Sequence, residues 1–149
     1  FVEWQPEFYG ARFLRQQQQG IYPARAFVQT PVERMLAANP PVGFQRNLEH
    51  LIVIARYQGI VPVLVSFVSC PCRPGGLGSK EMLAEIEEMN TLQRELAREL
   101  DASFFDLASV FPMDEALFLD SIHMSPAGAG RQAQLLAEFL IESQLIPVR

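Results

Sequence analysis

The sequence predicts one α/β domain in which helices cover the faces of a parallel sheet. Helix-like and strand-like segments alternate from residue 44 onward, and such alternation is typical of parallel crossovers. One strand-like segment is apolar at nearly every position, as in strands that are buried on both faces. A length of 149 residues suits one domain, and 49% apolar against 19% charged residues supplies enough side chains for a core.

Charge and hydropathy argue against several classes of protein. The net charge of −5 comes from 12 basic and 17 acidic residues, and the basic ones are scattered, which disfavours nucleic-acid and polybasic membrane binding. The longest apolar runs fall short of the roughly 18 residues that a membrane span requires. Because the chain starts at Phe1 and shows no secretory signal peptide, we expect a processed protein or a fragment.

Residues 1–43 form an irregular segment that is rich in aromatic residues and proline. A short helix is expected over Val32–Ala38, because Pro31 suits the first position of a helix. The aromatic side chains either cover a cleft or pack as a loop on the core. They are Phe1, Trp4, Phe8, Tyr9 and Phe13.

Residues 44–57 are predicted to form the first long helix, and Gly59 ends it. Its apolar side chains recur at helical spacing on one stripe, which comprises Phe44, Leu48, Leu51, Ile52 and Ala55. His50 lies off this stripe and is expected at the surface. The run Ile60–Val68 follows as a strand buried on both faces, with Pro62 tolerated near its start.

The loop at residues 70–78 carries both cysteines of the chain. Cys70 and Cys72 flank Pro71, which is a weak signal for a metal or redox site and too little for a disulfide scaffold. Residues 75–80 superficially resemble a phosphate-binding loop, but the lysine follows the serine and the required spacing is absent. Ser79 is better explained as the cap of the next helix.

That helix is predicted over Lys80–Leu100, with most of its charges on a solvated face. Asn90 lies near its apolar stripe and is interpreted as a satisfied polar residue rather than a ligand. The segment Ala102–Leu107 reads as a second buried strand, which contains the carboxylate of Asp106. Ser125 as cap and Pro126 in the first turn begin a final helix that runs to Glu142.

Two strands are too few for a stable parallel sheet with helices on both faces. We therefore expect further strands, which would precede Phe1. An edge left open in this way exposes unpaired backbone groups, so the chain is expected to self-associate unless its N-terminal segment covers the edge.

Asp120 and His123 are the candidate catalytic residues. They lie between a strand and a helix, where α/β folds collect their functional sites. A carboxylate three residues before an imidazole can accept Nδ1–H, so that Nε2 is free to act as a general base toward a hydroxyl nucleophile. The alternative is a turn in which Asp120 only caps local backbone N–H groups.

Residues Phe118–Gly128 resemble the final sequence block of the SGNH (GDSL-type) hydrolases, in which Asp and His stand three apart before a small cap and a helix. Arg46–Glu49 with the strand Val61–Phe67 looks like the family's fourth helix–strand unit. Asn90 with Phe104–Leu107 looks like the next unit. The resemblance covers residues 44–145 and implies a three-layer flavodoxin-like sandwich with an ester-hydrolysing Ser-His-Asp site. His123 would be the base and Asp120 its orienting partner.

The family's nucleophile and oxyanion blocks are absent from the chain, since no Gly-Asp-Ser is present and Asn39 and Asn47 stand in no matching context. These blocks belong to the first three strands of the family fold, which are the strands that the topology lacks. Four serines lie at a strand or next to His123, and none of them is expected on a sharp strand-to-helix turn that would project its hydroxyl. They are Ser66, Ser69, Ser121 and Ser125.

The sequence thus supports two functions. The first is the C-terminal part of a serine ester hydrolase that needs no metal or organic cofactor and acts on a small-molecule, carbohydrate or lipid ester. Its nucleophile lies outside this chain, so the chain alone is expected to be inactive. The second is a non-catalytic α/β binding module on the same scaffold, with the aromatic N-terminal segment as its recognition surface.

Overall fold

The computed structural model describes residues 34, 37, 40–72 and 79–146. The chain divides into two compact units, Phe1–Ala38 and Asn39–Arg149, and the elements below lie in the second unit. Of the helix predicted over Val32–Ala38, only residues 34 and 37 are described, and both are helical. The aromatic segment before it lies outside the described residues, as does most of the loop predicted at 70–78.

The second unit alternates helices and strands as the sequence predicted from residue 44. The elements in chain order are α4 (Val42–Tyr57), β1 (Val63–Val65), α5 (Lys80–Glu99), β2 (Ser103–Phe105), α6 (Leu107–Val110), the 3₁₀ turn η2 (Glu115–Leu117) and α7 (Pro126–Glu142). The two strands pair in parallel, with Val63 opposite Ser103 and Val65 opposite Phe105. The predicted α/β class with a parallel sheet is therefore confirmed.

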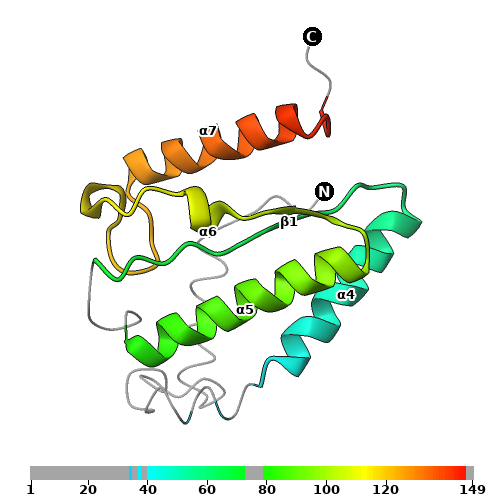
Figure 1. Ribbon diagram of the computed structural model, residues 1–149, viewed down its shortest axis with the longest axis horizontal. Helices are drawn as coiled ribbons and strands as arrows, with labels where there is room; N and C mark the ends of the chain where they lie inside the picture. Colours follow the sequence, from blue (N-terminus) through cyan, green and yellow to red (C-terminus); the bar gives the residue numbers. More distant parts are fainter. Residues whose placement is uncertain (1–33, 35–36, 38–39, 73–78, 147–149) are drawn as a thin grey trace, which may run out of the picture. The chain divides into compact units, whose positions relative to one another are not determined.

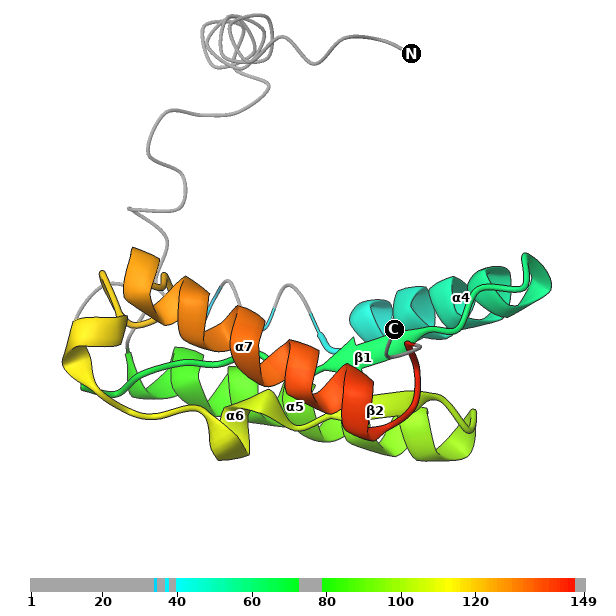
Figure 2. The same ribbon diagram turned by 90° about the horizontal axis from the view of Figure 1, so that it is seen from above.

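Helices lie on both faces of this two-stranded sheet. Because side chains alternate across a strand, Leu64 and Val65 point to opposite faces. Leu64 packs with Ile52 of α4 and Leu96 of α5. On the other face, Phe105 stacks on Phe139 of α7 with ring centroids 4.6 Å apart. Figure 1 shows α7 on one side of β1 and α5 on the other, and Figure 2 shows α7 lying along the strands.

The strands are shorter than predicted, with three residues each in place of nine and six. The prediction that Ile60–Val68 is buried on both faces is wrong at Ile60 and Val61, which are 59% and 65% exposed. These residues are exposed because β1 has only β2 as a neighbour in the described part of the chain, so no second strand covers them. Phe67 is also exposed, and its backbone bonds to a side chain instead of a third strand.

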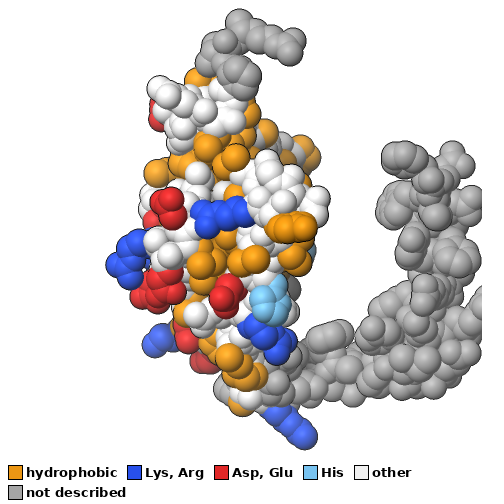
Figure 3. Space-filling view, turned by 90° about the vertical axis from the view of Figure 1, so that its right-hand side faces the viewer, with side chains coloured by type: hydrophobic (Ala, Val, Ile, Leu, Met, Phe, Trp, Pro, Cys, Tyr) orange, Lys and Arg blue, Asp and Glu red, His pale blue; other side chains and the backbone are white. Residues whose placement is uncertain are grey.

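The apolar stripe predicted on α4 is only partly buried. Ile52 is 1% exposed, whereas Leu51, which belongs to the same predicted stripe, is 63% exposed. Val53 and Ile54 are exposed as well. Figure 3 shows hydrophobic side chains uncovered among charged ones on one face of the molecule. None of the helices described here combines the length and the hydropathy needed to cross a membrane.

Serine caps begin both long helices that follow the strands, as predicted. Ser79 accepts a hydrogen bond from the N–H of Met82, and Ser125 accepts one from the N–H of Gly128. The start of α7 also packs closely on η2, since a Cβ at Gly128 would collide with the carbonyl oxygen of Leu117. Ser125 donates its hydroxyl proton to the carbonyl of Ala116, which fixes the helix start on the same turn.

Candidate functional site

A short turn before α7 carries Asp120 and His123. The N–H of Leu119 donates to the carbonyl of His123 at 2.8 Å, and Phe118 forms an antiparallel bridge with Met124. Phe118 is 1% exposed and packs edge-to-face against Phe111 in the core. The turn is thus anchored by a buried aromatic side chain, although the side chains of Asp120 and His123 are exposed to solvent.

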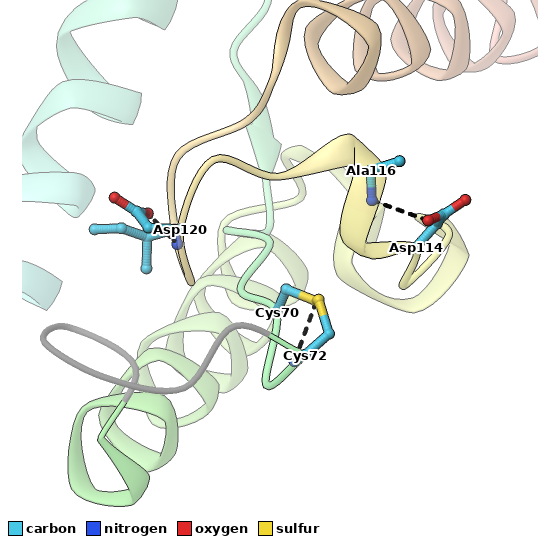
Figure 4. The surroundings of a disulfide bond; sticks show 6 residues. Cys70, Cys72, Asp114, Ala116 and Asp120 are labelled. Carbon is cyan, nitrogen blue, oxygen red and sulfur yellow. Dashed lines mark hydrogen bonds between the residues drawn. A yellow bond between two sulfur atoms is a disulfide. The ribbon is translucent and has the colours of Figure 1, made fainter.

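The carboxylate of Asp120 divides its two oxygens between the backbone and the imidazole. Oδ2 lies 2.7 Å from Nδ1 of His123. Oδ1 accepts from the N–H groups of Ile122 at 2.9 Å and His123 at 2.7 Å. The sequence left two alternatives open, a carboxylate that caps local backbone N–H groups and a carboxylate that contacts the imidazole. Asp120 does both. Figure 4 shows Asp120 on its turn with a hydrogen bond to the backbone.

These hydrogen bonds keep Asp120 ionised. The N–H of Ile122, followed by the imidazole and the N–H of His123, lowers the pKa of Asp120 from 3.8 to about 2. Asp120 is therefore ionised at neutral pH and can only accept hydrogen bonds. The proton of the 2.7 Å contact must then lie on Nδ1, which leaves Nε2 of neutral His123 with a free lone pair.

The pair lies where the fold predicts a site, beyond the carboxyl end of a parallel strand. His123 lines a cavity of about 320 Å³ together with residues 65–68, which form the end of β1 and the chain after it. The imidazole is 65% exposed and the Asp120 side chain 54%. A ring so placed can exchange protons with a bound molecule. His50 is exposed on α4, as predicted, and does not line this cavity.

No serine in the described residues donates to His123, and every serine of the sequence lies within those residues. Ser66 lines the same cavity, but it is 1% exposed. Its hydroxyl donates to Asp106 at 3.1 Å and accepts from the N–H of Ala108 at 2.8 Å. Ser121 is equally buried, and its Oγ has no hydrogen-bond partner there. Within the described residues, no serine hydroxyl is therefore paired with the imidazole of His123.

Two polar residues of α5 contact the residues that directly follow the two strands. Asn90 is 2% exposed, and its amide accepts from the N–H of Phe67 at 2.7 Å and donates to its carbonyl at 2.9 Å. This confirms the prediction of a satisfied polar residue. Arg94 is exposed, as predicted for most charges of this helix, and it also contacts Asp106 at 2.7 Å, an ion pair that sequence spacing alone does not reveal.

The two cysteines are joined as a disulfide, a state that the sequence left open. Figure 4 shows the bond on the segment that follows β1. The N–H of Cys70 donates to the carbonyl of Ser121 at 2.7 Å, so this segment is tied to the turn of Asp120 and His123. Within the described ranges, no group of three or more His, Cys, Asp or Glu side chains is arranged to hold a metal ion.

The arrangement supplies an oriented base and its carboxylate partner beside a cavity. It can accept a proton at Nε2 and return it to a leaving group. Comparison of the chain with models of known protein families, with curated proteins and with solved structures gave no match.

Proposed function

We propose that this chain supplies the His-Asp half of a Ser-His-Asp ester hydrolase of the SGNH type. One observation carries the proposal, namely the 2.7 Å contact between Nδ1 of His123 and Oδ2 of Asp120 beyond the carboxyl end of β1. The resemblance of residues 118–128 to the final SGNH block supports the same assignment. We place the serine outside these 149 residues, because no serine contacts the imidazole of His123 and Ser66 and Ser121 are each 1% exposed.

In the proposed reaction His123 acts first as a base and then as an acid in each half-reaction. Nε2 of His123 takes the proton of the serine hydroxyl as its oxygen attacks the ester carbonyl. The imidazolium then protonates the leaving alcohol, and an acyl-serine remains. Water then attacks the acyl carbonyl as His123 takes its proton, the bond from the acyl carbon to the serine oxygen breaks, and the imidazolium returns the proton to that oxygen. Asp120 stabilises the imidazolium throughout, and the chemistry requires neither a metal nor an organic cofactor.

The scaffold proposed for this reaction is a three-layer, flavodoxin-like sandwich. Core clusters on both faces of the β1–β2 pair support it, as does the edge of β1 that no described strand covers. A strand added at that edge would end beside the cavity of His123. We place the serine and its oxyanion donors on such added strands.

Ester hydrolysis by the chain alone and by a complete domain tests the proposal. The 149-residue chain should not turn over a short-chain nitrophenyl ester above background, whereas a domain that includes the serine-bearing strands should. In that domain, His123→Ala should lower kcat/KM by several orders of magnitude, and Asp120→Asn by a similar or somewhat smaller factor. Turnover by the chain alone that depends on His123 would contradict an external nucleophile. A complete domain without hydrolysis would favour the binding module.

A further inference from the structure

An apolar groove lies beside the Asp120–His123 turn. It has a volume of about 380 Å³, within the range of small-molecule sites. Its apolar walls come from the start of α4, from α5 and from two residues near the turn. These side chains are Phe44, Phe67, Met82, Ile86, Met89 and Ile122.

The groove and the cavity of His123 share two walls, Phe67 and Ile122. Both walls are fixed relative to the catalytic pair. Ile122 belongs to the turn itself, and its N–H donates to Oδ1 of Asp120 at 2.9 Å. Phe67 is held from α5, because its N–H and carbonyl both bond to the amide of Asn90. The groove therefore adjoins the cavity of His123 at these two side chains.

The lining indicates the chemistry of the occupant. Glu85 and Gln93 are the polar residues at the groove, and neither is a cation that would attract a carboxylate or a phosphate. Met82 and Met89 have flexible, polarizable side chains that adapt to an apolar chain. A neutral alkyl chain fits this set better than a sugar, which would leave its hydroxyls without partners.

We propose that this groove is the acyl subsite of the hydrolase and binds the alkyl chain of a medium-chain ester. This inference rests on the proposed function, since the acyl carbonyl is placed at His123. Burial of each added methylene is worth about a fourfold gain in affinity until the groove is full. The hydrolase is accordingly expected to prefer octanoate esters over acetate esters.

Binding of alkyl methyl ketones to the 149-residue chain tests the groove without any turnover. These neutral ketones carry the acyl carbonyl and no leaving group. Methionines labelled with ¹³C at the methyl group serve as reporters, since Met82 and Met89 line the groove whereas Met113 is exposed elsewhere. Affinity should rise at least tenfold from 2-hexanone to 2-decanone, with shifts at Met82 and Met89 and none at Met113. Affinity independent of chain length, or shifts of equal size at Met113, would overturn the proposal.

A matched pair of variants on α5 localises the site. Ile86→Gln places an amide in the groove and should lower ketone affinity at least tenfold. Glu87→Gln changes the neighbouring exposed position and should leave affinity unchanged. The helical circular dichroism signal shows whether each variant folds. If Ile86→Gln does not fold, the chain-length series on the unaltered protein tests the groove. Equal affinity of the two folded variants would contradict the assignment.

Activity of the complete domain separates failure of the groove from failure of the proposed function. Hydrolysis with no preference for octanoate over acetate esters overturns the acyl subsite and leaves the hydrolase standing. Chain-length-dependent ketone binding without hydrolysis of any ester overturns the hydrolase, and with it the assignment of the groove as an acyl subsite. Ketone binding that depends on chain length, together with a preference for octanoate that Ile86→Gln abolishes, supports both.

Discussion

At the scale of single residues, Asp120 is central to the site because its two carboxylate oxygens have different hydrogen-bond partners. Oδ1 holds the backbone of the turn and Oδ2 holds the imidazole. This part of the site could be predicted from the sequence, since Asp120 and His123 lie three residues apart and their contact is local. The proposed serine nucleophile could not be located in this way, because no Gly-Asp-Ser block stands in the sequence.

The hydrogen bonds to Asp120 predict its titration. Its pKa in the folded chain is about 2, below the ordinary value of 3.8, so the folded state binds protons less readily than the unfolded chain. The stabilisation from ionised Asp120 should be fully present above about pH 4 and lost as the pH falls toward 2. The ¹³C shift of its carboxyl carbon measures this midpoint. A midpoint at the ordinary value would show that these bonds do not form in solution.

At the scale of elements, local sequence signals predict where the helices begin, whereas pairing between distant segments determines how long the strands are. Ser79 and the Ser125–Pro126 pair were sufficient to locate the starts of α5 and α7, because a cap needs only its own first turn. The apolar run Ile60–Val68 could not indicate where pairing stops, since strand length depends on neighbours. The contact of Arg94 with Asp106 likewise depends on how α5 packs on β2.

The junction of η2 and α7 offers a prediction with a control in the same helix. Gly128→Ala should destabilise the fold by about 1–3 kcal/mol, since the added methyl group meets the backbone of Leu117. Gly130→Ala meets nothing within 4 Å and should stabilise α7 by about 0.5–1 kcal/mol. Chemical denaturation measures both free energies of unfolding. A loss at Gly130 as large as that at Gly128 would rule out the steric explanation.

At the scale of the whole molecule, the described part of the chain has an α/β core with an uncovered apolar side. The exposed side chains of α4 adjoin a strand that has a neighbour on one edge only, among the residues described. The sequence predicted a sheet in need of more strands from the strand count alone. It did not predict which side chains of α4 would be left exposed, because burial depends on what packs there.

This uncovered side predicts self-association of the chain, unless the N-terminal segment covers it. Sedimentation should show dimers or larger species whose fraction rises with concentration. Leu51→Glu should reduce that fraction, because Leu51 is 63% exposed on α4. Ala137→Glu adds the same charge at an exposed position of α7 and should have little effect. A monodisperse monomer with a cooperative melt would contradict this prediction.

Labelling of the nucleophilic serine by a fluorophosphonate is the most direct measure of the role assigned to His123. The rate constant is determined in a complete domain for the unaltered protein, for His123→Ala and for His50→Ala, which removes the other, exposed histidine. Our account predicts that His123→Ala slows labelling by several orders of magnitude while His50→Ala leaves it unchanged. Equal rates for all three proteins would contradict the assignment of His123 as the base.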